Sequence, residues 1–152
     1  MKTIRNFELK VKRVAVGEGT EPYGASVRSP SDVARITQLL IGESAQEHFL
    51  VVLLDVKNRV LGYSETSRGG IDTYPVDPRI VFRTALAVGA SSLIAAHNHP
   101  SGDCTPSTDD ILLTRRLKEA GELLGIQLLD HVIVTDTARL SFRPLSKLSS
   151  RL

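Results

Sequence analysis

Two histidines at the end of a predicted buried strand constrain the possible fold and function of this chain more than any other feature. Residues 91–96 (SSLIAA) predict a short interior strand, and His97 and His99 follow it directly. Because side chains two residues apart in an extended chain point to the same side, both imidazole rings are expected to face one space. Pro100 then ends the strand. Such a pair of rings is well arranged to bind a metal ion.

The next predicted helix begins at Ser107 and carries Asp109 and Asp110 in its first turn. Glycine and proline in the intervening loop let the chain double back, so this turn can return a carboxylate to the histidines. Two histidines and one carboxylate, with a position left for water, are typical of a catalytic rather than a structural zinc site. Ser107 and Asp110 also form the pattern of a capping box, and a His-x-His at a strand end is common in hydrogen-bonded loops. The residues alone leave these interpretations equally open.

Helices and strands alternate along the chain. Helices are predicted from Ser29-Pro30, Asp77-Pro78 and Ser107, ending near Gly42, Gly89 and Gly125. The apolar segments predict strands at 47–56, 59–66, 91–96, 126–135 and 139–142, of which the first two and the last two form hairpins. We therefore expect an α/β fold of three layers, in which helices flank a mixed β-sheet.

Composition excludes several classes of protein. The 152 residues are enough for one domain. The longest apolar run, 49–54, is far shorter than the roughly 20 residues of a membrane helix, and the charged N-terminus is unlike a signal peptide. We expect a cytoplasmic protein that does not enter membranes. The single cysteine, Cys104, excludes an internal disulfide and a cysteine-based zinc ribbon, and a dispersed net charge of +2 gives no support to nucleic-acid binding.

The histidine segment resembles a known motif. His97-x-His99-Pro100, six residues and then Ser107-x-x-Asp110 match the JAMM motif of the MPN/JAB metallopeptidases. The segments HNHPSGD and LDHVIV are similar to the RadC-like branch of that family, and the resemblance covers residues 34–142. It implies a three-layer fold like that of cytidine deaminases. Deamination itself is disfavoured, because His-x-Glu and Pro-Cys-x-x-Cys are absent.

The resemblance also implies a domain plan. Residues 1–30 are expected to form an N-terminal strand and loop extension, 31–145 the JAB/MPN domain and 146–152 a tail. RadC-like proteins often carry an N-terminal helix-hairpin-helix domain, and we expect this chain to be too short for one. The implied partner is a protein or peptide substrate, and the sequence leaves the oligomeric state open.

The roles of the site residues are likewise implied by the resemblance. His97, His99 and Asp110 would ligate Zn²⁺, Glu47 would be the general base and acid, and Ser107 would donate a hydrogen bond to the oxyanion during hydrolysis of a peptide or isopeptide bond. Only the resemblance selects Glu47, since Glu43 and Glu65 are rival carboxylates. Asp103 and Asp109 are rival ligands, which we interpret as exposed acids.

Other polar residues near the motif have weaker predictions. We expect His131 to be a core histidine oriented by its neighbour Asp130 rather than a fourth ligand. His48 is expected at the surface and Cys104, where relatives commonly have proline, close to the metal as a bystander. Asn98 and Ser101 would shape the histidine loop, and Arg68-Gly69-Gly70 resembles a loop of the family. Arg79 is interpreted as a surface arginine, and residues 63–74 would border a substrate groove.

Two other functions stay open. The DNA-repair name of the RadC family suggests a nucleic-acid-associated factor, which predicts salt-sensitive DNA binding. A non-catalytic MPN scaffold with a structural zinc is the second alternative. The glutamate and the serine argue against it, because a structural site needs neither an open position nor a base.

Overall fold

The computed structural model describes residues 24–69 and 76–142. The predicted N-terminal strand and the tail lie outside these residues. Five strands form one sheet in the order β2-β1-β3-β4-β5. The strands are β1 (His48–Leu54), β2 (Val60–Arg68), β3 (Ser92–Asn98), β4 (Gln127–Val134) and β5 (Arg139–Ser141). Only β3 and β4 are parallel, so the sheet is mixed, as predicted.

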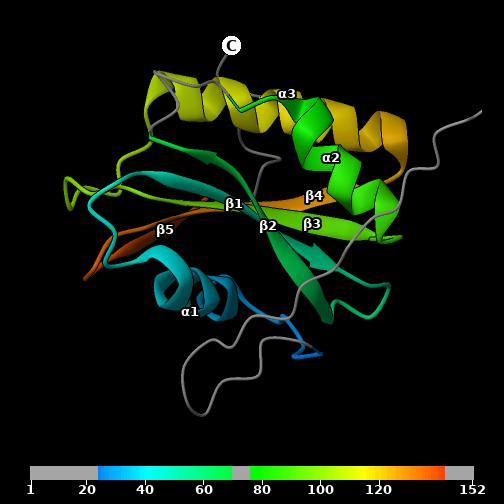
Figure 1. The fold of residues 1–152 in the computed structure, drawn as a ribbon, viewed down its shortest axis with the longest axis horizontal. Coiled ribbons are helices and arrows are strands. Elements are labelled where there is room, and N and C mark those ends of the chain that lie inside the picture. Colours follow the sequence, from blue (N-terminus) through cyan, green and yellow to red (C-terminus); the bar gives the residue numbers. More distant parts are fainter. Residues whose placement is uncertain (1–23, 70–75, 143–152) are drawn as a thin grey trace, which may run out of the picture.

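Three helices cover the two faces of the sheet. They are α1 (Pro30–Ile41), α2 (Pro78–Ala87) and α3 (Thr108–Leu124). In Figure 1, α1 lies below the sheet, whereas α2 and α3 lie above it. The predicted three-layer α/β fold is thereby confirmed. None of the helices in the described part of the chain has the length and apolar character that crossing a bilayer requires.

The predicted elements agree with the observed ones except at their ends. Both hairpins are present as antiparallel pairs, β1 with β2 and β4 with β5. The strand β2 continues to Arg68, two residues beyond the predicted end at residue 66. Before α1, the backbone of Gly24 and Ala25 is hydrogen-bonded to Val60 at the start of β2.

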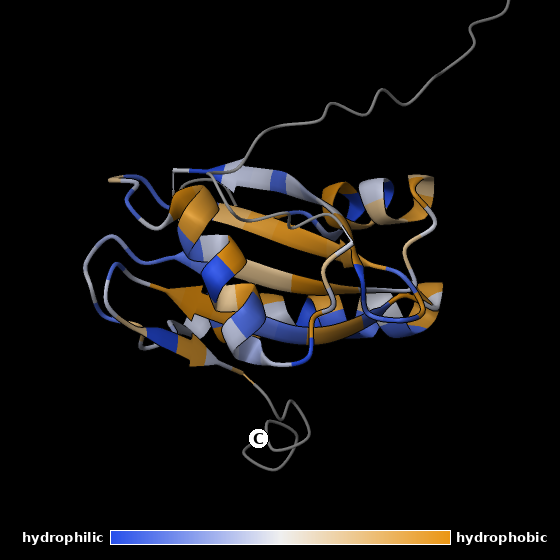
Figure 2. Ribbon diagram, turned by 90° about the horizontal axis from the view of Figure 1, so that it is seen from below, coloured by the Kyte–Doolittle hydropathy of each residue, from blue (hydrophilic) through white to orange (hydrophobic). Residues whose placement is uncertain are grey.

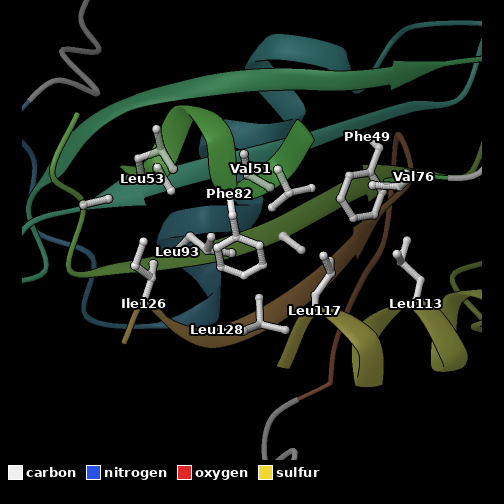
Figure 3. Close-up of a cluster of buried hydrophobic side chains, with 14 residues drawn as sticks. Phe49, Val51, Leu53, Val76, Phe82, Leu93, Leu113, Leu117, Ile126 and Leu128 are labelled. Carbon is white, nitrogen blue, oxygen red and sulfur yellow. The ribbon is translucent and has the colours of Figure 1, made fainter. Parts of the chain in front are cut away.

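Two apolar clusters hold the layers together. One lies between the sheet and α2 with α3, around Phe82 and Leu117 (Figure 3). The other packs α1 against the opposite face through Val33, Val52 and Ile94. The strands β1 and β3 are buried on both faces and are correspondingly hydrophobic in Figure 2. The end of β3 is therefore a rigid, water-excluded place from which to present polar side chains.

Candidate metal centre

The two histidines of the motif lie at the carboxyl end of β3. His97 is the penultimate residue of the strand and pairs with Phe49 of β1 and Ile133 of β4. The His99 N–H donates to the carbonyl of Val134 at 2.9 Å, so backbone pairing with β4 continues past the strand end. As the alternation predicts, the rings face one another, with their Nε2 atoms 2.9 Å apart.

Asp110 reaches the same point from the first turn of α3. Its backbone N–H donates to Ser107 Oγ, and its Oδ2 accepts the Ser107 backbone N–H at 2.8 Å. The Asp110 oxygens also lie 3.2 Å from His97 Nε2 and 3.4 Å from His99 Nε2. The capping box and the histidine-carboxylate cluster thus exist together. The cap fixes the carboxylate where it meets the rings.

A relay of hydrogen bonds fixes the tautomer of His97. The Thr114 hydroxyl donates to the Asp110 carbonyl at 2.6 Å, so its oxygen accepts from His131 Nδ1, also at 2.6 Å. His131 Nε2 is then an acceptor, and it lies 2.8 Å from His97 Nδ1. His97 therefore carries its proton on Nδ1. Its Nε2 lone pair faces His99 and Asp110.

His99 has the same tautomer for a separate reason. Its Nδ1 lies 2.7 Å from the carbonyl oxygen of Asp103, which can only accept. In the neutral rings, the Nε2 atoms of both histidines therefore carry lone pairs, and these converge with the Asp110 carboxylate. Such an arrangement needs a cation, either a proton or a metal ion.

The shifts in pKa agree with this arrangement. A hydrogen bond to the Asp110 carboxylate raises the pKa of His99, against the opposing effect of partial burial. Burial raises the pKa of Asp110, but hydrogen bonds with His97 and His99 and the charge of His97 outweigh it, so the pKa lies well below its usual value. Complete burial lowers the pKa of His131 well below its usual value, and His131 is therefore neutral.

The geometry fits a tetrahedral metal ion. The candidate ligand atoms of His97, His99 and Asp110 all lie within 4.8 Å of one another. Tetrahedral ligands about 2.0–2.2 Å from zinc are about 3.3–3.6 Å from each other, and the distances of 2.9, 3.2 and 3.4 Å between the Nε2 atoms and the Asp110 oxygens are close to or somewhat below that range. The side chains of His97 and Asp110 are 0% and 2% exposed, whereas that of His99 is 15% exposed. The site is thus shielded from solvent on the side of His97 and Asp110, and solvent reaches it beside His99.

Glu47 lies at the same end of the sheet. It directly precedes β1, and Phe49 of that strand pairs with His97. Glu47 is partly buried, and its negative charge is one of the influences that raise the pKa of His99. Of its rivals, Glu43 is exposed and Glu65 is bound to His48 and Arg68.

The other predicted residues lie around the cluster. Ser107 is exposed at the start of α3, beside Asp110. Asp103 and Asp109 are exposed, as interpreted, and Asp103 Oδ1 accepts the Thr105 N–H. Arg79 is exposed and paired with Asp77, in agreement with its interpretation as a surface arginine.

Two expectations need correction, and a third agrees with the structure. His48 is not a surface residue: its side chain is 12% exposed, because its ring lies between Ser44 and Glu65. His131 is a core histidine, as predicted, but Asp130 accepts its backbone N–H and does not orient its ring. Cys104 is not among the three candidate ligands, in agreement with its interpretation as a bystander, and its thiol lies 4.0 Å from the Thr135 hydroxyl.

Sequence reasoning missed Thr114 and gave Asn98 no defined role. Thr114 lies on the inner face of α3, four residues after Asp110, and the helical period could have indicated its direction. Its contact with His131 joins residues 17 positions apart. No local pattern indicates such a pairing.

Comparison with known proteins gives one consistent result. A family model described as RadC-like JAB domain matches residues 27–147, a span that begins before the predicted residue 34. A UPF0758 protein of Caldanaerobacter subterraneus is 45% identical over 124 residues, 82% of this chain and 53% of its own length. A UPF0758 protein of Clostridium perfringens is 43% identical over 132 residues, 87% of this chain and 57% of its own length. The chain thus spans about half the length of the curated relatives it matches.

Proposed function

Since the chain belongs to the RadC-like JAB domain family, we propose that it is a zinc-dependent metallopeptidase that hydrolyses a peptide or isopeptide bond. The observation that carries this proposal is the convergence of His97, His99 and Asp110 at one point, with the Nδ1 atoms of both rings bound elsewhere. Glu47 is close enough for its charge to raise the pKa of His99. It would supply a general base, which a purely structural zinc site does not need. The proposed partner is a protein or peptide substrate, and the proposed compartment is the cytoplasm.

The ligands have distinct tasks in this proposal. His97 and His99 offer neutral Nε2 atoms, and Asp110 offers a carboxylate whose charge offsets that of a divalent ion. When bound, zinc lowers the pKa of a water molecule toward neutrality and polarises a carbonyl oxygen.

Glu47 and Ser107 act on the substrate. Glu47 accepts a proton from the attacking water as its oxygen bonds to the carbonyl carbon, and delivers that proton to the amine nitrogen as the C–N bond breaks. Ser107 Oγ accepts the Asp110 backbone N–H and keeps its own hydrogen. The hydroxyl can therefore donate to the oxyanion that forms during the attack.

Metal content is the first test. Elemental mass spectrometry of the purified chain is expected to find about one zinc per chain, lost in His97→Ala and in Asp110→Asn. Asp109→Asn is the matched control, because Asp109 is exposed in the same helical turn. Absence of zinc from metal-replete protein would remove the basis of the proposal.

Hydrolysis is the second test. The zinc-loaded protein is incubated with a proteome-derived peptide library, and new amino termini are identified by mass spectrometry. Glu47→Gln is expected to retain zinc and to produce none of the new termini. Equal cleavage by wild type and Glu47→Gln would contradict the assigned role. Zinc without cleavage by either protein would favour the scaffold function instead.

A further inference from the structure

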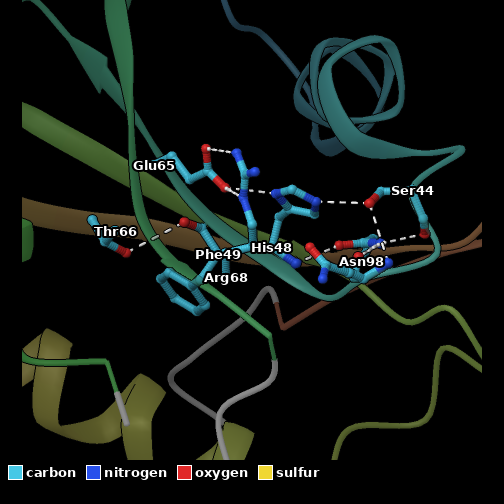
Figure 4. A network of polar contacts seen from close by, with 8 residues as sticks. Ser44, His48, Phe49, Glu65, Thr66, Arg68 and Asn98 are labelled. Atoms are coloured by element: carbon cyan, nitrogen blue, oxygen red, sulfur yellow. Dashed lines mark hydrogen bonds and ion pairs between the residues drawn. The ribbon is translucent and has the colours of Figure 1, made fainter. Parts of the chain in front are cut away.

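A single buried amide links the histidine strand to the segment that carries Glu47. Asn98 lies between His97 and His99 and is 1% exposed. Its Oδ1 accepts the backbone N–H of His48 at 2.7 Å. Its Nδ2 donates to the carbonyls of Gln46 at 2.9 Å and Ser44 at 3.3 Å. Figure 4 shows these contacts as the connection between Asn98 and the chain before β1.

The hydrogen bonds of Asn98 lie just beyond the point where backbone pairing between β1 and β3 ends. Pairing between β1 and β3 extends only as far as Phe49 with His97, so residues 44–48 have no ladder with β3. Two of the three backbone groups that Asn98 binds belong to Gln46 and His48, the immediate neighbours of Glu47. One side chain therefore holds the backbone on both sides of this glutamate.

The amide is the group that this position requires. An N–H and two carbonyls must be satisfied, and an asparagine side chain supplies one acceptor and two N–H donors. Aspartate keeps the acceptor but has no donors, and an aliphatic side chain has neither. A buried amide with all of these bonds made is rigid, because each bond would be costly to leave unpaired.

The opposite side of the segment is held by β2. The His48 ring lies 2.7 Å from Ser44 Oγ and 2.6 Å from Glu65 Oε1, and Arg68 holds the same glutamate (Figure 4). The Glu47 carbonyl accepts the Gly69 N–H at 2.8 Å. The segment is thus fixed from both neighbouring strands. Among the described residues, Asn98 supplies the side-chain hydrogen bonds that join it to β3, the strand of the two histidines.

We propose that Asn98 is a positioning residue that sets where the Glu47 carboxylate stands relative to His97 and His99. This inference rests on the proposed function only for its catalytic consequence. Asn98 lies between the two candidate metal ligands in the sequence, and it also fixes the backbone of the proposed general base relative to them. A misplacement of a catalytic group by 1 Å can cost about a hundredfold in rate, so this register matters for turnover.

The contact itself is tested on the metal-free protein by amide hydrogen exchange and NMR. In Asn98→Ala, the His48 amide is expected to exchange about five- to tenfold faster, the loss expected for one hydrogen bond. In Asn98→Asp, which keeps the acceptor but loses both donors, the His48 amide is expected to lose less protection than in Asn98→Ala. The matched control is Gln38→Ala, which removes another side-chain amide bound to a distant carbonyl, that of Thr135. Unchanged protection of the His48 amide in Asn98→Ala would overturn the proposal.

The position of Glu47 is tested with Co²⁺ bound in place of zinc. The paramagnetic shifts of the amides of Gln46, Glu47 and His48 depend on their distance and direction from the ion. In Asn98→Ala these shifts are expected to change, while those of β1 and β3 residues such as Val52 and Ile94 stay as in wild type. Unaltered shifts at residues 46–48 would overturn the positioning role.

Turnover separates this inference from the proposed function. With a peptide cleaved by wild type but not by Glu47→Gln, Asn98→Ala is expected to lower kcat about a hundredfold with little change in KM. Adding Asn98→Ala to Glu47→Gln should cause no further loss. An unchanged kcat would overturn the catalytic consequence. If wild type cleaves nothing, the peptidase proposal fails, whereas the exchange and Co²⁺ measurements still decide the position of Glu47.

Discussion

His131 Nε2 lies 2.8 Å from His97 Nδ1, and this contact holds the ring proton of neutral His97 on Nδ1, away from the cluster. The bond depends in turn on Thr114, whose hydroxyl oxygen accepts from the other nitrogen of His131. Outer partners of this kind tune metal affinity as well as ring orientation. Four predictions follow from the relay and from the helix cap beside it.

Replacing Thr114 with valine is expected to weaken zinc binding about 10- to 100-fold, because His131 loses the acceptor that fixes its tautomer. The measurement is a zinc titration in competition with a chromophoric chelator. Thr37→Val is the matched control. Thr37 is also buried in a helix and donates to the carbonyl four residues before it, that of Val33, but on α1. Equal losses in the two variants would mean that the effect comes from the helix and not from the relay.

His131→Phe is expected to weaken zinc binding to a similar extent while keeping the core packed. The His131 ring stacks on Phe142 at 4.8 Å and meets the edge of Phe49, and a phenyl ring can occupy the same space. Because Thr114 acts through His131, the double variant should bind zinc no more weakly than His131→Phe alone. Additive losses in the same chelator titration would refute a shared relay.

The stability of the metal-free protein is expected to depend on pH through His131. Burial depresses its pKa in the folded state, so below the unfolded value of about 6.5 the unfolded chain binds a proton that the folded protein does not. The free energy of unfolding therefore falls as pH falls from 7.5 to 5, by up to about 1.4 kcal/mol per pH unit from this residue.

The measurement is urea unfolding of wild type and His131→Phe at both pH values. The raised pKa of His99 has the opposite effect, with stability that is present below about pH 6.5 and lost as pH rises through the folded value. His99 is present in both proteins, so most of its own contribution cancels in the difference between them. Wild type should lose more stability than the variant on acidification, and parallel pH profiles would speak against a neutral buried His131.

Ser107 is expected to have separable structural and chemical roles. Ser107→Ala removes the cap of α3 and should lower the free energy of unfolding by about 1 kcal/mol. Ser107→Asp restores a good cap but has no hydroxyl, so it should recover stability without turnover. Ser107→Thr keeps both groups and serves as the control. Chemical denaturation and peptide cleavage are measured in parallel, and full turnover in Ser107→Asp would exclude the role in oxyanion stabilisation.

Local patterns predicted the parts of the site that are local in sequence. The two-residue period placed His97 and His99 together, and the capping pattern of Ser107 placed Asp110 at the start of a helix. Contacts across the sheet could not be predicted in this way. Asn98 meets His48 across 50 residues, and His97 meets His131 across 34, both through the register of β3 with its neighbours. The alternation that suggested an exposed His48 ignored Glu65 on the adjoining strand.

The carboxyl end of β3 and the first turn of α3 supply all three candidate ligands from residues 97–110. Ligands so close in sequence can meet without the rest of the sheet, because closing a short loop costs little chain entropy. An unfolded chain would therefore keep part of its affinity for the ion. Metal would then stabilise the fold by less than its affinity for the native protein implies, since only the difference in binding between the two states counts.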